Sequence, residues 1–177
     1  EKKFERGEVL IAIVLSNQKE YLSAVIENRK HIYNEMVSKN YSLNDIFQYN
    51  WESKLLYVLF QNSIENNKSI VEHANILASR IINILNKLYT KDDTETNYYA
   101  VGFEALSSIL IVIKDENIKQ NILDNILYIY KILNDRYDNE YGLFKFTDNS
   151  SRVDITGHII NGILALNYNI NYIINDN

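Results

Sequence analysis

Cysteine is absent from the sequence, and its absence removes several kinds of chemistry at once. The chain can form no disulfide framework, no zinc site with thiolate ligands and no thiol nucleophile. Proline is also absent and only five glycines occur, so that besides glycine only asparagine and aspartate are available to interrupt a helix. The composition therefore favours helices and excludes thiol chemistry.

A basic surface is missing as well. The 18 lysines and arginines are scattered and outnumbered by 23 acidic residues, which gives a net charge of −5, and we therefore expect no nucleic-acid partner. No apolar run approaches the roughly 18 residues that a membrane span needs, so we expect no membrane partner. The first residues, "EKKFERGE", are polar and unlike a signal peptide, which makes the cytoplasm the expected location. Because the chain does not begin with methionine, we expect it to be part of a longer protein.

Apolar residues recur at helical spacing along most of the chain. We expect a first helix from about Glu8, helices over residues 19–37, 51–64, 69–89, 98–113 and 117–137, and a last helix from about Asp154 to about Leu166. Residues 38–50, 90–97 and 138–151 are predicted to be loops, with a short extended piece at Leu143 to Phe146. The tail after Leu166 is predicted to be either a frayed helix end or a short extra helix.

The helices alternate in character and form a repeat. The odd ones are apolar nearly all round and the even ones carry a charged face, as inner and outer helices of stacked hairpins do. The odd segments "RGEVLIAIVL", "NWESKLLYVL", "VGFEALSSIL" and "ITGHIINGIL" align at Glu8, Glu52, Glu104 and His158. These positions are 44, 52 and 54 residues apart, a period that predicts a single all-α domain of stacked antiparallel helical hairpins over residues 1–177.

The repeat also predicts where polar groups gather. If all inner helices point the same way, their first turns meet at one end, where the helix dipole favours carboxylates. That end would carry Glu8, Glu52, Glu104, Asp154 and His158, with Trp51, Tyr99 and Arg152 close by.

Three stretches carry a resemblance to a known superfamily. "RGEVLIAIVLSNQKEYLSAV" is similar to the hairpin that α/α-toroid proteins repeat, and "YGLFKF" followed by "RVDITGHIINGILAL" resembles their common ending. The superfamily includes the six-hairpin glycosidases and the N-acylglucosamine 2-epimerase-like proteins. The resemblance implies an α/α toroid or a C-terminal part of one, with too few hairpins for a closed ring. A missing N-terminal half or another subunit would then complete the ring, unless the structure is an open arc.

The same resemblance implies a carbohydrate-active domain with a sugar ligand, which would be a glycoside hydrolase or a sugar epimerase. Its candidate catalytic residues are Glu52, Glu104, Asp154 and His158, and its candidate substrate-binding residues are Glu8, Trp51, Tyr99 and Arg152.

Each of these residues also has a purely structural interpretation. An acid near a helix start is often only a cap or a dipole partner, and a lone Trp before an apolar helix is often part of the core. Asp154 and His158, at i and i+4, fit either an Asp-oriented base or a helix cap beside a packed histidine. We expect His31 and His73 to lie in solvent, and residues 91–96 to form a solvated connection or bind a cation.

Sequence motifs do not decide between these interpretations. No P-loop, G-x-S-x-G, H-E-x-x-H or dinucleotide fingerprint occurs, and no third ligand joins Asp154 and His158, so we expect no metal and no cofactor. The alternative function is a non-catalytic helical-repeat scaffold that binds a peptide or protein partner.

Overall fold

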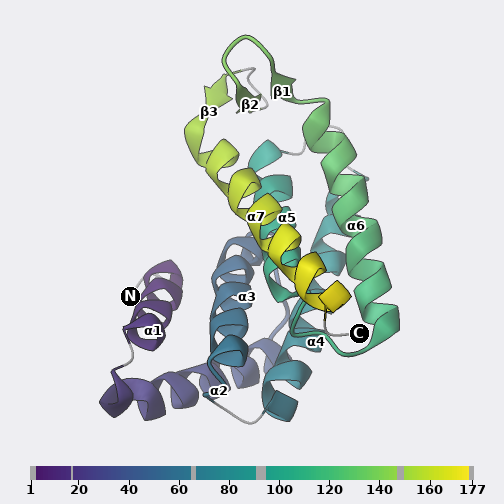
Figure 1. Ribbon diagram of the computed structural model, residues 1–177. Coiled ribbons are helices and arrows are strands. Elements are labelled where there is room, and N and C mark those ends of the chain that lie inside the picture. Colours follow the sequence, from purple (N-terminus) through teal and green to yellow (C-terminus); the bar gives the residue numbers. More distant parts are fainter. Residues whose placement is uncertain (1–2, 17, 65–66, 91–94, 147–149, 176–177) are drawn as a thin grey trace.

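The computed structural model describes residues 3–16, 18–64, 67–90, 95–146 and 150–175 and is mostly helical (Figure 1). Within these residues seven α-helices follow one another: α1 (Lys3–Leu15), α2 (Leu22–Ser38), α3 (Asp45–Gln61), α4 (Asn67–Leu88), α5 (Thr96–Ile109), α6 (Glu116–Asn134) and α7 (Val153–Asn175). A short 3-10 helix, η1 (Lys19–Tyr21), precedes α2, and the strands β1 (Tyr137–Asp138), β2 (Leu143–Lys145) and β3 (Ser151–Arg152) precede α7. The prediction of a helical protein is confirmed, and none of the described helices is long and apolar enough to cross a membrane.

The odd-numbered helices pack one on the next, in the order α1, α3, α5, α7. Two contacts show the relative direction of α3 and α5: Asn44 contacts Tyr98, and about one or two turns further along both helices Asn50 contacts Glu104. Because the residue numbers in these contacts increase along both helices, α3 and α5 run parallel. The pairs Glu104–His158 and Ser107–Asn169 show the same for α5 and α7. Helix α4 packs on α3, α5 and α6, while α6 packs mainly on α5.

Helix α5 lies at the centre of the molecule. All of its residues from Tyr99 to Ile109 are buried, and only one of them, Glu104, carries a charge. A helix that is apolar all round is stable only when other elements surround it, and here α3, α4, α6 and α7 do so. The rest of the core comes mainly from the apolar faces of α3 and α4. The position of α5 therefore determines where Glu104 can find partners.

Helix α3 begins earlier than the sequence pattern predicted. The prediction of a loop or short turn over residues 38–50 is confirmed only for residues 39–44, since α3 starts at Asp45. The Asp45 carboxylate accepts hydrogen bonds from the backbone N–H of Ser42, at 2.7 Å, and from the Ser42 hydroxyl, at 3.2 Å. Both hydrogen bonds run from Ser42 to the Asp45 carboxylate, and they tie the turn that precedes the helix to the first residue of α3.

The C-terminal part combines a small antiparallel sheet with a long helix. Phe144 pairs with Tyr137 on one side and with Arg152 on the other, so that the extended piece predicted around Leu143 is confirmed as β2. The chain then enters α7 directly. This helix continues to Asn175 rather than ending near Leu166, and neither predicted form of the tail is correct.

Candidate functional site

Three parallel helices meet at one buried carboxylate, that of Glu104 on α5, which is 1% exposed. Asn50 of α3 donates a hydrogen bond from Nδ2 to Oε2 at 2.7 Å. His158 of α7 places Nδ1 2.7 Å from the same oxygen. Lys54 of α3 places Nζ 2.7 Å from Oε1. The carboxylate thus joins helices α3, α5 and α7 through three polar side chains.

The surroundings keep this carboxyl ionised. Burial alone raises the pKa of Glu104, because a charge is poorly solvated in the interior. The hydrogen bonds from His158, Lys54 and Asn50, together with the positive charge of Lys54, outweigh burial and hold the pKa below its ordinary value of 4.5. Glu104 therefore accepts hydrogen bonds at neutral pH and is unsuited to donate a proton there.

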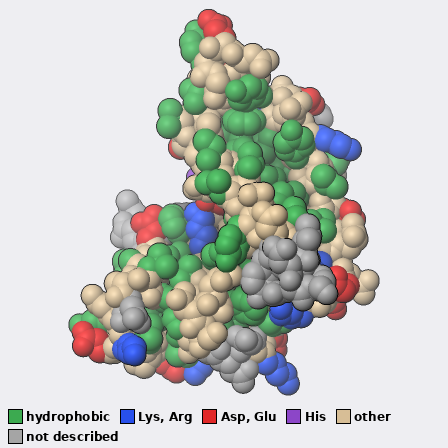
Figure 2. Space-filling view, in the orientation of Figure 1, with side chains coloured by type: hydrophobic (Ala, Val, Ile, Leu, Met, Phe, Trp, Pro, Cys, Tyr) green, Lys and Arg blue, Asp and Glu red, His purple; other side chains and the backbone are tan. Residues whose placement is uncertain are grey.

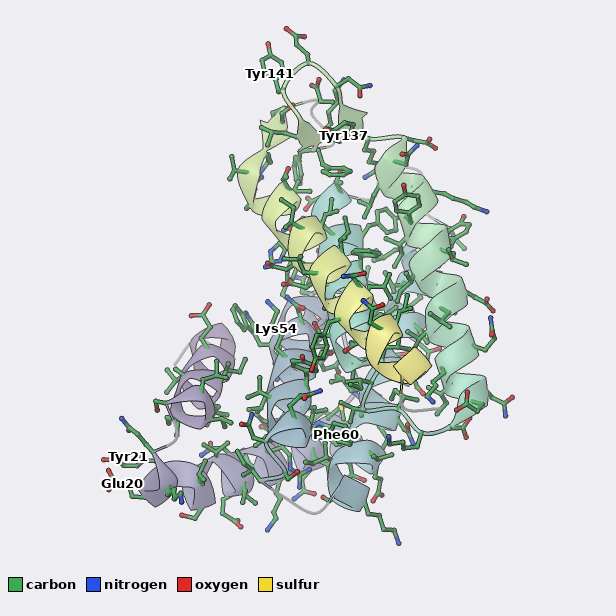
Figure 3. All side chains as sticks on the ribbon, in the orientation of Figure 1. Glu20, Tyr21, Lys54, Phe60, Tyr137 and Tyr141 are labelled. Atoms are coloured by element: carbon green, nitrogen blue, oxygen red, sulfur yellow. The ribbon has the colours of Figure 1, made fainter. Side chains whose placement is uncertain are left out.

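The partners of Glu104 reach the surface although Glu104 does not. The side chains of Lys54 and His158 are 23% and 30% exposed. Figure 3 shows Lys54 on α3, beside the place where α7 passes. Its Nζ also lies 4.4 Å from the centre of the Trp51 ring, a cation–π contact. When His158 donates its Nδ1 proton to Glu104, its Nε2 is left as the atom that can accept a proton.

The structure brings together two of the predicted catalytic residues, Glu104 and His158, and separates the others. Glu52 is buried, and its Oε1 accepts a hydrogen bond from Gln48 at 2.6 Å. Residues 50 and 54 lie within about 40° of each other on a helix, whereas residue 52 points to the opposite side of α3. Glu52 and Glu104 therefore do not face each other as the two carboxyls of a glycosidase would.

Of the remaining predicted residues, Trp51 touches the Glu104 cluster through Lys54, and the others lie outside it. Glu8 is exposed on α1. Arg152 and Asp154 pair with each other through contacts of 2.6 and 2.9 Å. Trp51 is half-buried, and a Cβ on Gly7 would lie 2.5 Å from its Cβ, so the Trp side chain packs where α1 crosses α3.

Tyr99 belongs to a different part of the interior. It is 3% exposed, stacks on Tyr89 at 6.0 Å, and lies under the guanidinium of Arg136. It cannot touch a ligand at Lys54 or His158, because it points from α5 toward α4 and α6 instead.

The expected first-turn location of the polar groups is wrong for Glu52 and Glu104, whereas Asp154 does lie in the first turn of α7. Glu52 and Glu104 lie about two turns inside α3 and α5, because both helices begin well before the aligned positions. The helix dipole falls off within the first turn, so it contributes little at Glu104. Side-chain partners stabilise this carboxylate instead.

Asn50 and Lys54 were not among the predicted site residues. Both are polar residues on the apolar helix α3, four positions apart and thus on one face. That pairing is the signal in the sequence, but it does not say which neighbouring helix the face meets.

A second buried polar cluster joins α2 to α4. Arg29 is 2% exposed and donates to Ser69 Oγ at 2.8 Å, and its Nη1 lies 3.4 Å from His73 Nδ1. The expectation that His73 lies in solvent is wrong, because its ring is 1% exposed and stands edge-on to Tyr33 at 5.3 Å. Burial and the charge of Arg29 lower the pKa of His73 to about 3, so the ring is neutral. His31, by contrast, is exposed on α2.

Among the described residues, no group of three or more histidine, aspartate or glutamate side chains is placed to hold a metal ion. Of the predicted cation-binding connection at residues 91–96, residues 91–94 lie outside the part of the chain that the structure describes.

Comparison with known proteins finds no family model, no curated protein and no solved structure that matches the chain.

Proposed function

We propose that this protein is a helical-repeat scaffold that binds a partner protein by packing a helix of the partner against α7. The observation that carries the proposal is an apolar stripe along α7 that the rest of the described chain leaves exposed. Its four residues are Val153, Ile160, Leu164 and Tyr168, which are 75%, 50%, 62% and 49% exposed.

The stripe has the spacing of a helix-packing face. Steps of seven, four and four residues keep the side chains on one side of α7, as a contact with another helix requires. After His158 the helix contains no charged residue. Figure 2 shows hydrophobic side chains gathered over α7 and the neighbouring α6. An exposed apolar surface of this kind is typical of a protein-binding site.

The position of α7 in the row favours a helix as the covering element. Each odd helix packs on the next, from α1 to α7, and α7 is the last described helix of the row. A partner helix on the stripe would continue this packing. It would also fit the proposal that the chain is an arc of an α/α toroid that another subunit or segment completes. The proposed location of the protein is the cytoplasm.

Site-specific photocrosslinking tests the scaffold proposal. A photoreactive phenylalanine analogue replaces Leu164 on the stripe, or Tyr141 in the sheet turn as a control that is equally exposed, at 65%. In cells that naturally make the protein, the Leu164 probe should give one discrete product. Its crosslinked peptide should come from a partner protein and have the spacing of an apolar helix face. A product that forms equally from Tyr141, or no product from Leu164, would contradict the proposal.

A second candidate function is suggested by the contact between Glu104 and His158. A carboxylate that holds Nδ1 leaves Nε2 available as a general base, and Lys54 and the Trp51 ring lie on the same patch. Trp rings stack on sugars and a histidine base suits epimerisation, so we propose a sugar ligand for this patch as the alternative to the scaffold. The opposite orientation of Glu52 disfavours a two-carboxylate glycosidase.

Sugar binding is testable with matched histidine variants. The NMR signals of the His158 ring should move when a panel of neutral and amino sugars is titrated, and His158→Ala should abolish any rise in melting temperature that a sugar causes. His31→Ala, on the exposed face of α2, is the control and should retain it. If no sugar moves the His158 signals, the alternative fails.

A further inference from the structure

A cavity of about 220 Å³ lies between α5, α6, the small sheet and α7, on the side of α7 away from the Glu104 cluster. Among the described residues its lining is largely aromatic and contains no charged side chain: Phe103, Tyr130, Tyr137 and Phe144 contribute rings, Ile163 an aliphatic wall, and Asn134 an amide. Phe103 is 2% exposed and forms the floor, whereas Tyr130, Tyr137 and Ile163 are 42–55% exposed and surround the opening.

The cavity arises because α6 and α7 pack on α5 but hardly on each other. In Figure 1 the two helices stand farther apart at the sheet end, and Figure 3 shows Tyr137 at that end. The sheet holds the wall in place, since the rings of Tyr137 and Phe144 are 5.1 Å apart and belong to paired residues. The floor is equally fixed, because Gly162 of α7 lets its backbone approach Phe103 so closely that a Cβ would lie 2.4 Å from the ring.

The size and lining indicate what would fit. An apolar cavity of about 150 Å³ in another protein binds benzene, so a space of about 220 Å³ suits a molecule about half as large again, which is a bicyclic aromatic. The absence of charge in the lining disfavours ions, because an ion would lose its hydration without a partner. Three of the lining residues carry polar groups that suit one polar atom of the ligand, namely the amide of Asn134 and the hydroxyls of Tyr130 and Tyr137.

We propose that this cavity is a binding site for a small, uncharged, bicyclic aromatic molecule with one hydrogen-bonding atom. The site and the partner-binding stripe on α7 consist of different residues, since Ile159 and Ile163 line the cavity and none of the four stripe residues does. The two proposals can therefore fail separately.

Indole is a suitable probe, and its binding to the whole chain is measured by isothermal titration calorimetry and ligand-observed NMR. Saturable binding with one site per chain is expected. Ile163→Trp should fill the cavity and weaken binding by about tenfold or more, which corresponds to about 1.4 kcal/mol. Val37→Trp adds the same side chain at a similarly exposed position on α2, 53% against 48%, and should leave the affinity within about twofold. Circular dichroism melts check that both variants fold, and Ile163→Phe replaces Ile163→Trp if the latter does not.

The charge of the ligand provides a further arm. Indole-3-carboxylate should bind at least about tenfold more weakly than indole, because its charge would be desolvated. The proposal is overturned if indole does not bind, if it binds the two Trp variants equally, or if the carboxylate binds as well as indole. It is also overturned if the apparent affinity for indole becomes weaker as the protein concentration is raised, since a second copy of the chain then occupies the cavity.

Discussion

His158 Nδ1 lies 2.7 Å from Glu104 Oε2, although the two residues are 54 positions apart in the chain. The contact links the centre of α5 to the first half of α7, and through Asn50 and Lys54 it extends to α3. A buried carboxylate is costly unless it is paired, so this cluster favours one register of the three parallel helices over the alternatives. The cluster brings together two of the four aligned repeat positions, Glu104 and His158, and leaves out Glu8 and Glu52.

Glu104→Gln should destabilise the fold. The substitution keeps the shape of the side chain but removes the charge that Lys54 and His158 face, and hydrogen bonds to a charged group contribute about 1.5–3 kcal/mol. We expect a loss of that order in the free energy of unfolding, measured with urea at pH 7. Glu27→Gln is the control, because Glu27 forms an exposed pair with Lys30, and it should change stability by less than about 0.5 kcal/mol. Equal effects of the two variants would show that the Glu104 cluster does not stabilise the fold.

Lys54→Met should lower the free energy of unfolding near pH 7 and lower it less below pH 4. The native pKa of Glu104 is lowered, so the stabilisation that its ionised form gives is present above the unfolded pKa, near 4.5, and is lost as pH falls through the lower folded pKa. The variant loses the Lys54 contribution to the ionised form. The difference in unfolding free energy between wild type and Lys54→Met should therefore be largest near pH 7 and shrink below pH 4. A difference that is constant over this range would contradict the conclusion that Lys54 stabilises the ionised form of Glu104. Lys30→Met, which removes an exposed lysine, is the control.

His73 should make the protein less stable as pH falls from 6.5 toward 3. The unfolded chain binds a proton at this histidine below about pH 6.5, whereas the native ring does so only near its lowered pKa of about 3. Between these values the unfolded state binds more protons than the native state. The free energy of unfolding therefore decreases by up to about 1.4 kcal/mol for each unit by which the pH is lowered. Urea unfolding at pH 7.5, 6.0 and 5.0 measures the slope.

His73→Gln should remove most of that slope, since the substituted side chain does not titrate. Glu104→Gln should keep it, because Glu104 titrates below this range. If His73→Gln retains the full slope between pH 7.5 and 5.0, another group is responsible.

Two glycines of α7 should respond in opposite directions to alanine. A Cβ at Gly162 would lie 2.4 and 2.6 Å from two Phe103 ring atoms and 3.2 Å from the Glu104 Cα, whereas nothing lies within 4 Å of a Cβ at Gly157. We expect Gly162→Ala to destabilise by about 1–3 kcal/mol through overpacking. Gly157→Ala should stabilise by up to about 1 kcal/mol, because alanine favours the helix. Thermal melts compare them, and a stabilising Gly162→Ala would mean that α7 does not approach α5 so closely.

The sequence was informative about elements and less so about their ends. Periodicity located all seven helices and the extended piece at β2, because alternation of apolar and polar residues depends only on which side of an element is covered. It missed the start of α3 at Asp45 and the continuation of α7 to Asn175. Both ends are rich in asparagine, which composition associates with loops. The hydrogen bond from Ser42 to the Asp45 carboxylate and the one from Asn169 to the Ser107 carbonyl override that preference.

For the candidate site, the repeat alignment singled out Glu104 and His158, and the parallel packing of α5 and α7 places them in contact. It treated Glu52 as equivalent to them, yet Glu52 faces Gln48 on the other side of α3. The catalytic and sugar-binding roles of these residues stay predictions.

By itself, the sequence determined that this protein is built of alternating apolar and amphipathic helices with one polar residue at a recurring position. Only the tertiary structure decided that Glu104 is buried among Lys54, Asn50 and His158, that His73 is enclosed beside Arg29, and that a cavity opens between α6 and α7. The physical reason is that helical periodicity shows which side chains share a face. Which other face they meet depends on how far each helix extends and how closely its neighbours pack, and both are set by contacts between residues distant in the chain.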